Sequence, residues 1–352
     1  MWTRRGLLTL PGLALAQTSA PPAPIDEYHP ANLKLSHRMP IRSMTDADLQ
    51  FLQQLGIRFA RVEWGNTVTF DEMKATQERL ARFGMTIYSA VHYVYRKTRL
   101  QLGQPGRDQD IETFQRFLAD CGRLRIPVTN IDWHPANTYT TAEVMTERGY
   151  RSRQFKLDDF RAKVEKQAFD RVYTAEDIWT TYTYFIKAVL PVAEKAGVKL
   201  ALHPDDPPLA MMNGVAKLFV HYDGYRRAEE IAGASQHWGL TFCVGTWAEG
   251  GTEMGKDVFG MIRDFGGRGK IFDVHFRNVS RPLPEFIETF PDDGYFDMYE
   301  VMKALRAVKF AGAAQPDHIP QFAGDDSFRR AGVAYAIANM RMMLRRANRD
   351  VG

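Results

Sequence analysis

The most constraining feature of the sequence is an alternation of short apolar runs with amphipathic helical segments. Each run is bounded by glycine, proline or polar turn residues, as expected of buried strands. The predicted strands lie at residues 33–37, 57–63, 85–91, 128–133, 198–203, 240–244, 271–276 and 311–315. Because no shift in composition divides the series, we expect residues 26–352 to form a single (β/α)8 barrel.

Residues 136–173 interrupt this alternation. They are polar, aromatic and basic without a clear period, which indicates an elaborated excursion after the fourth strand rather than a linker. The alternative fold is a doubly wound open sheet. Residues 245–251 follow a predicted strand but lack the G-x-G-x-x-G spacing of a dinucleotide-binding turn, so the barrel is favoured.

The first 25 residues have the pattern of an export leader. Arg4 and Arg5 precede an apolar segment, residues 6–16, that ends in Ala-Leu-Ala. This predicts a twin-arginine signal and a periplasmic or extracellular location; an uncleaved anchor and a chance Arg-Arg pair are the alternatives. No other apolar run approaches the roughly 20 residues that span a bilayer, so we expect no membrane association after cleavage.

Charge and cysteine content narrow the choice of partners. The 46 Lys and Arg exceed the 42 Asp and Glu by a net +4, and this charge is not gathered in a basic arm, which argues against nucleic acid as a partner. Cys121 lies in a helical apolar stripe and Cys243 at a strand end, so we expect no disulfide. The sequence does not determine the oligomeric state, and a homo-oligomer is one possibility.

Four chemically distinctive residues stand at the carboxyl ends of the last four predicted strands. In a closed barrel these ends meet at one mouth, where barrel enzymes hold their ligands. Two imidazoles, a thiolate and a carboxylate suit a borderline ion such as Mn²⁺, Fe²⁺, Co²⁺ or Zn²⁺ rather than Ca²⁺ or Mg²⁺. Singly, such residues are more often structural, but their recurrence at successive strand ends indicates a metal site. They are His203, Cys243, His275 and Asp317.

Other polar residues near these strand ends are candidates for supporting roles. Arg277 follows His275 by two residues and so shares its face of the strand. Since a thiolate and a carboxylate would neutralise a divalent ion, an anionic substrate needs a further cation, and Arg277 is the candidate. Asp205 and Asp206, set between prolines, are expected to orient neighbours rather than bind metal. Further residues expected to touch substrate or support ligands are His134, Tyr139 and Gln315.

A longer segment, residues 185–208, ends in His-Pro-Asp-Asp-Pro-Pro. It resembles the signature of the mannonate dehydratases, metal-dependent lyases with a xylose-isomerase-like barrel. The resemblance covers essentially the whole chain after the leader, weakly before residue 170 and strongly after it. Shorter matches follow at residues 240–245, 275–277, 294, 296–301 and 316–318.

The resemblance implies a metal bound by the four strand-end residues, with Mn²⁺ expected and Fe²⁺ the alternative. It implies His318 as an acid/base group, a role that suits a pKa near neutrality, and we expect Arg277 beside it in catalysis. The implied reaction converts D-mannonate, or a close aldonate, to 2-keto-3-deoxy-D-gluconate and water. In it the metal would hold the C1 carboxylate and C2 hydroxyl and acidify the C2 proton.

The sequence also departs from the family pattern. Phe328 falls where the family has its catalytic tyrosine, and phenylalanine cannot transfer a proton. Gln315 replaces an arginine, residues 319–321 replace Gly-His-Gln, and residues 138–141 replace an Asp-Trp pair and an arginine. The retained metal cradle therefore comes with an altered substrate and proton-transfer environment.

These departures leave the reaction open at this stage. Tyr139, Tyr335 or a water are candidates to replace the lost hydroxyl. A sugar isomerase or epimerase would keep the barrel, the metal and enediolate chemistry without protonating a leaving hydroxyl. A non-catalytic periplasmic sugar-acid binding protein is the alternative from another class.

Overall fold

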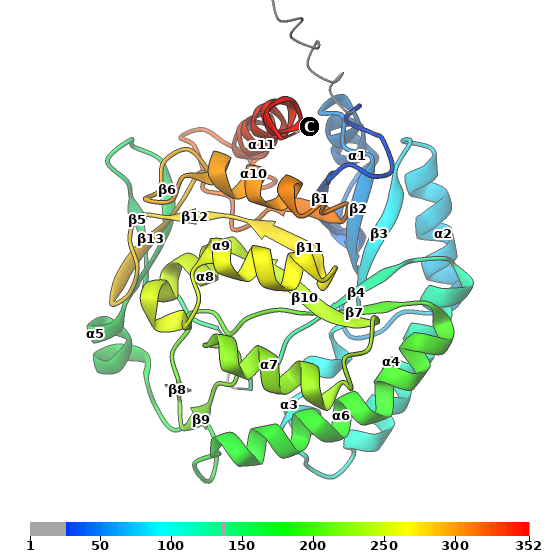
Figure 1. The fold of residues 1–352 in the computed structure, drawn as a ribbon, viewed down its shortest axis with the longest axis vertical. Helices are drawn as coiled ribbons and strands as arrows, with labels where there is room; N and C mark the ends of the chain where they lie inside the picture. The colour runs from blue at the N-terminus through cyan, green and yellow to red at the C-terminus, as the bar shows by residue number, and fades with distance from the viewer. Residues whose placement is uncertain (1–25, 136–137, 352) are drawn as a thin grey trace, which may run out of the picture.

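The computed structural model describes residues 26–135 and 138–351. At its centre is a closed barrel of eight parallel strands, which confirms the predicted (β/α)8 fold and rules out the open sheet (Figure 1). Around the barrel the strands follow the order β1-β14-β11-β10-β7-β4-β3-β2. Their bounds are β1 Lys34–Pro40, β2 Phe59–Glu63, β3 Thr86–Val91, β4 Val128–Ile131, β7 Lys199–Leu202, β10 Trp238–Cys243, β11 Ile271–Phe276 and β14 Ala313–Pro316. The expected export leader, residues 1–25, lies outside the described residues.

Helices cover the outside of this barrel (Figure 1). The longer ones pack in neighbouring pairs, with α4 against α6 and α10 against α11. They are α1 Asp46–Gln54, α2 Phe70–Ala81, α4 Arg107–Arg123, α6 Ala175–Ala196, α7 Tyr222–Ile231, α10 Met298–Ala307 and α11 Arg330–Asp350. Shorter helices are α3 Thr98–Gln101, α5 Leu157–Asp159, α8 Val244–Gly250 and α9 Val258–Met261, with single turns η1 Ile41–Ser43, η2 Tyr93–Arg96, η3 Phe160–Val164, η4 Gly251–Met254 and η5 Ile262–Gly266.

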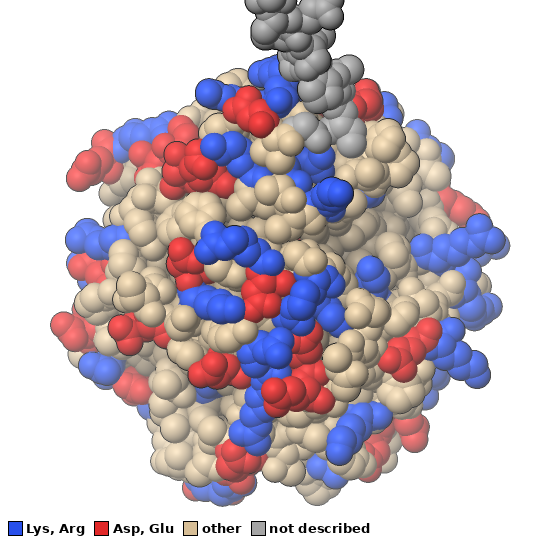
Figure 2. Space-filling model, viewed as in Figure 1, with Lys and Arg blue, Asp and Glu red and all other residues tan. Residues whose placement is uncertain are grey.

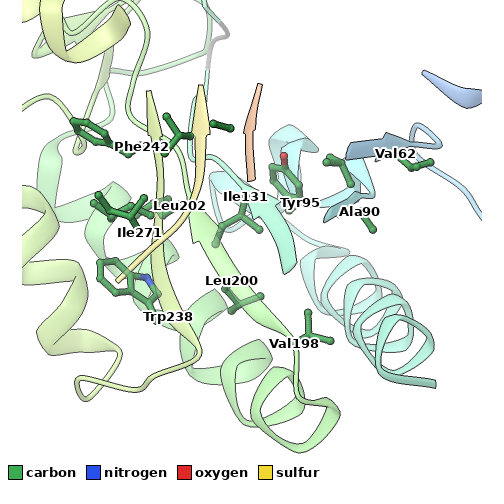
Figure 3. Packing of buried hydrophobic residues seen from close by; sticks show 14 of the residues in the cluster. Val62, Ala90, Tyr95, Ile131, Val198, Leu200, Leu202, Trp238, Phe242 and Ile271 are labelled. Atoms are coloured by element: carbon green, nitrogen blue, oxygen red, sulfur yellow. The ribbon is translucent and has the colours of Figure 1, made fainter. Parts of the chain in front are cut away.

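Side chains along each barrel strand alternate between two environments. Val62, Leu202 and Phe242 are buried in the apolar core between strands and helices (Figure 3). The residues that follow two of them, His203 and Cys243, face the interior of the barrel mouth. The packing of one face against the helices therefore fixes which residues the other face presents to the mouth.

The excursion at residues 136–173 is more regular than the sequence indicates. It contributes β5 Ala142–Met145 and β6 Arg151–Lys156 to an antiparallel sheet of order β12-β13-β6-β5. The other two strands, β12 Asn278–Val279 and β13 Glu285–Thr289, follow the seventh barrel strand. Most β5 side chains are exposed, so no apolar alternation marks the strand, and its sheet depends on partners far away in the chain. A second, two-stranded ribbon pairs β8 Met211–Met212 with β9 Val215–Ala216.

Three further properties bear on the predictions of charge, disulfides and membrane association. On the face in Figure 2, positive and negative side chains are interspersed. Cys121 and Cys243 are both buried and free. Within residues 26–135 and 138–351, none of the helices combines the length and the apolar character needed to span a bilayer.

The long helix α6 begins with a capping box. Thr174 Oγ1 accepts from Asp177 N, and Asp177 Oδ2 accepts from Thr174 N at 2.8 Å. We expect Thr174→Ala to lower the free energy of unfolding by about 1 kcal/mol, because one backbone N–H loses its partner. Urea denaturation measures this. Thr180→Ala, at an exposed site inside the same helix, is the control and should not destabilise; equal loss in both variants would contradict the role of the cap.

Candidate active site

The structure brings together the four side chains that the sequence places at successive strand ends. His203 Nε2, Cys243 Sγ and a ring nitrogen of His275 all lie within 4.8 Å of one another. His203 Nε2 is 3.1 Å from His275 Nδ1. Asp317, just after β14, joins them with Oδ2 at 3.6 Å from the same nitrogen. Four barrel strands thus converge on one cluster of metal-binding groups.

The protonation of this cluster suits a divalent ion. His203 Nδ1 donates to the Pro204 carbonyl at 2.7 Å, which leaves Nε2 of the neutral ring as an acceptor, 3.1 Å from His275 Nδ1. Burial lowers the pKa of His203 and His275, which favours the neutral form that could bind a metal. His275 Nε2 is buried and finds no hydrogen-bond partner among the described residues. Two neutral imidazoles, a thiol and a carboxylate are the donor set of a borderline transition ion.

Cys243 sits where its sulfur can carry negative charge. Its Sγ accepts from Thr246 Oγ1 at 3.1 Å and lies 3.6 Å from Arg277 Nη2. Burial raises the pKa of the thiol, and the guanidinium of Arg277 opposes that rise. A bound divalent cation removes the proton from a coordinating thiol.

Arg277 does not lie on the cavity wall, where we expected it to bind a substrate anion. Its side chain is fully buried and lies behind the cluster rather than on the wall of the cavity. It pairs with four carboxylates, with Asp206 at 2.9 Å, Glu249 at 2.5 Å, Glu288 at 3.2 Å and Asp317 at 3.6 Å. The strand β11 ends at Phe276, so the alternation that would aim Arg277 into the mouth stops one residue before it. Arg277 therefore positions other groups instead of holding a substrate anion.

The two aspartates after His203 contact side chains and backbone around the cluster. Asp205 Oδ1 lies 2.9 Å from His134 Nδ1, and its Oδ2 accepts from Phe219 N at 2.9 Å. His134 in turn packs edge-on against His203, with ring centroids 5.9 Å apart. Asp206 accepts from Arg277 and also lines the cavity.

Three of the expected supporting residues lie away from the cavity. The Tyr139 hydroxyl accepts from Asn213 Nδ2 at 2.6 Å. Tyr335 bonds to Asp292 beside a separate aromatic cluster. Gln315 is buried within β14 and does not line the cavity wall. Neither tyrosine is placed to replace the hydroxyl that Phe328 lacks.

A cavity of about 250 Å³ opens in front of the cluster, and half of its wall was missed by sequence reasoning. That wall comes from the first four strands and is strongly charged. Arg38 and Arg61 share Glu63, while Arg96 pairs with Asp132. The sequence did hold a signal, because Arg61 and Glu63 stand two residues apart inside an otherwise apolar strand. Tyr93 and Asn130 complete this side.

His318 lies at the edge of the same cavity. Its Nδ1 is 2.7 Å from Glu288 Oε1, on the unpredicted strand β13. Burial alone would lower the pKa of His318, but the carboxylates of Asp317 and Glu288 outweigh it and raise the pKa to about 8. With Nδ1 committed to Glu288, Nε2 is the nitrogen left for proton transfer.

The guanidinium of Arg277 packs so closely against Gly245 that there is no room for a Cβ at that position. A Cβ at Gly245 would lie 2.6 Å from Arg277 Nε and 2.8 Å from Cζ. Because four carboxylates hold the guanidinium, we expect Gly245→Ala to cost about 1–3 kcal/mol of unfolding free energy and to weaken metal binding through Cys243. Urea denaturation and metal content after dialysis measure both effects. The control is Gly267→Ala, where a Cβ meets nothing within 4 Å; matching losses in the two variants would contradict the crowding.

Comparison with known proteins agrees with this geometry. The family model for D-mannonate dehydratase (UxuA) matches residues 153–345. Mannonate dehydratase 2 of Halalkalibacterium halodurans is 27% identical over 277 residues, covering 70% of this chain and 78% of its own. The mannonate dehydratase of Streptococcus pneumoniae (strain 70585) is 31% identical over 255 residues, covering 65% and 68%.

Solved structures extend the likeness to three dimensions. The crystal structure of mannonate dehydratase from Streptococcus suis serotype2 has a TM-score of 0.78 at 26% identity, covering 90% of this chain and 96% of that one. An L-ribulose 3-epimerase structure, at a TM-score of 0.58 and 15% identity over 90% and 96% of the chains, shares the fold alone. The family model matches more than half of the chain, and the predicted strand-end residues gather beside one cavity. The chain therefore belongs to the D-mannonate dehydratase family.

Proposed function

We propose that the protein is a metal-dependent hydro-lyase that converts D-mannonate, or a close aldonate, to 2-keto-3-deoxy-D-gluconate and water. The observation that carries this is the convergence of His203, Cys243, His275 and Asp317 beside His318 at one cavity, in a chain of this family. A cavity of about 250 Å³ suits a metabolite-sized substrate, smaller than the drug-sized ligands of larger pockets.

The four clustered side chains would hold the metal, with Mn²⁺ as the proposed ion and Fe²⁺ the second choice. When bound, such an ion makes a C–H next to a carboxylate more acidic and stabilises the charge that develops. Both imidazoles are neutral, and Thr246 and Arg277 surround the sulfur with donors. The protein therefore provides ligands in the protonation states that binding requires.

The elimination needs one group to take the C2 proton and another to protonate the departing C3 hydroxyl. His318 suits the first role in its neutral form, in which Glu288 holds Nδ1–H and leaves Nε2 basic. Because its pKa is raised to about 8, this form predominates only above about pH 8. Tyr93 suits the second, since it is the tyrosine on the described wall of this cavity. Burial raises the pKa of Tyr93 although Arg61 opposes the shift, so the phenol keeps the proton that it must give.

The substrate carboxylate needs cations that Arg277 does not supply. On the wall opposite the cluster, three guanidiniums (Arg38, Arg61 and Arg96) face two carboxylates (Glu63 and Asp132). The excess of one positive charge favours an anion in the cavity. Guanidinium groups are suited to paired hydrogen bonds with a carboxylate.

Activity provides the direct test. Protein loaded with Mn²⁺ should form a 2-keto-3-deoxy acid from D-mannonate, and His318→Ala and Tyr93→Phe should each lower kcat by roughly 10²–10⁴-fold with metal content unchanged. Product is measured by chromatography and mass spectrometry. The control is Tyr139→Phe, whose hydroxyl bonds to Asn213 away from the cavity, and it should keep full activity.

Absence of product above the His318→Ala background would overturn the dehydratase assignment. An epimeric sugar or sugar acid in place of a keto-deoxy acid would favour the isomerase or epimerase alternative. Metal and aldonate binding without turnover would favour the binding protein.

We also propose that the protein is exported by a twin-arginine signal. The support is the sequence of Arg4 and Arg5, the apolar segment at residues 6–16 and its small-residue end. Replacing both arginines with lysine keeps the charge and should retain the protein inside the cell; fractionation and the N-terminal mass of the product measure this. Equal export of the doubly substituted chain would contradict the proposal.

A further inference from the structure

A second cavity of about 320 Å³ lies against the first at the barrel mouth. The two share Arg38, Asp317 and His318 as wall residues, so the second cavity adjoins the space in front of the cluster. We call this second cavity the arginine lobe, because Arg153 and Arg329 also line it. Nothing in the proposed reaction on a six-carbon aldonate uses it.

The arginine lobe carries uncompensated positive charge. Arg153, on β6, is half-buried and makes no ion pair with another described residue. Its cross-strand neighbour Glu143 instead approaches Arg151, at 4.0 Å. Arg329 donates to the Ile319 carbonyl and likewise has no carboxylate partner in the described chain.

Arg38 and Asp317, which also line the lobe, do not remove its excess of positive charge. Arg38 shares the single carboxylate of Glu63 with Arg61. Asp317 is turned to the cluster, with Oδ2 3.6 Å from both His275 Nδ1 and Arg277 Nε. Half-buried cations without partners are costly unless a ligand anion meets them.

The other wall of the lobe is apolar. The Phe328 ring packs edge-on against His37 and Phe51, with centroids 6.0 Å and 6.1 Å apart. The substitution that removes a hydroxyl at this position therefore leaves carbon surface beside guanidinium groups. Such a mixture suits the end of a carbon chain that carries an anion.

From this geometry we infer that the natural substrate is a sugar acid with a second anionic group at the end remote from the metal-binding cluster. Arg153 and Arg329 bind that group, which is a carboxylate or a phosphate. The inference rests on the proposed function and keeps its chemistry, since C2 still loses a proton and C3 a hydroxyl, released together as water. The second anion selects the substrate and takes no part in the bond changes.

Three sugar acids that differ only at C6 test the inference with the metal-loaded, full-length protein. D-mannonate has one anion, D-mannarate adds a C6 carboxylate, and D-mannonate 6-phosphate adds a phosphate. One of the two dianions should have a kcat/KM at least about tenfold above that of D-mannonate, the effect expected of a hydrogen bond between charged groups. The dianion that is preferred identifies the second group.

Variants at Arg153 connect this preference to the lobe. Arg153→Gln should abolish the preference while leaving kcat/KM for D-mannonate within about twofold, and Arg153→Lys should restore part of it. The matched control is Arg161→Gln, at an exposed arginine of the same excursion that does not line the lobe. An unchanged melting temperature and metal content show that each variant is folded.

Two results would overturn the inference while the dehydratase function stands. One is turnover of D-mannonate with neither dianion preferred, and the other is an equal loss on all three acids in Arg153→Gln. If none of the acids is turned over, the proposed function fails, and calorimetry decides the lobe separately. Tighter binding of a dianion than of D-mannonate, lost in Arg153→Gln, supports the lobe, and equal binding of all three acids overturns it.

Discussion

The candidate site depends on one fully buried guanidinium. Arg277 holds Asp206 on the loop after β7, Glu249 on α8 and Glu288 on β13, and its Nη2 approaches the sulfur of Cys243. Three loops that leave different strands are thereby tied to one planar group with a fixed fork of donors. Removing such a partner leaves buried carboxylates unpaired, which typically costs about 3–5 kcal/mol. The geometry of the cluster and of His318, which Glu288 orients, therefore depends on a residue that does not line the cavity.

Much of this arrangement could be predicted from the sequence, for a definite reason. Apolar runs marked the eight barrel strands, and closure of parallel strands forces residues such as His203 and Cys243 to one mouth. Arg277 was expected on the cavity wall because the two-residue period was extended past Phe276, where β11 ends. The antiparallel sheet was missed because β5 is mostly exposed, and β6 pairs with β13 more than 100 residues away, as at Gln154 and Ile287. The hydrophobic pattern within a short segment carries little information about pairing between strands that lie far apart in the sequence.

The charged cavity wall formed by the first four strands was not predicted from the sequence, for a different reason. The family model begins at residue 153 and the resemblance is weak before residue 170, so it pointed to neither Arg61 nor Asn130. Both face the barrel interior and belong to one network, in which Asn130 Nδ2 donates to Thr241 Oγ1 at 2.7 Å and to Asp273 Oδ2 at 2.8 Å. Burial raises the pKa of Asp273 to about 6, although Arg61 opposes the rise. A strand-by-strand search for polar residues at alternate positions would have found this layer beneath the cluster.

Charge balance connects the metal-binding cluster to the arginines around it. With a divalent ion bound, a thiolate at Cys243 and the carboxylate of Asp317 would together neutralise it, so the cluster itself would exert little net attraction on an anion. Attraction must come from the surrounding walls, where Arg38, Arg61 and Arg96 outnumber their carboxylates by one. Arg153 in the adjoining lobe adds charge that no described carboxylate offsets. The metal-binding groups and His318 thus come from the second half of the barrel, while Tyr93 and the guanidiniums that would select the anion come from the first half and the excursion. Loops and walls of a (β/α)8 barrel can change in this way while the strand-end cluster stays in place.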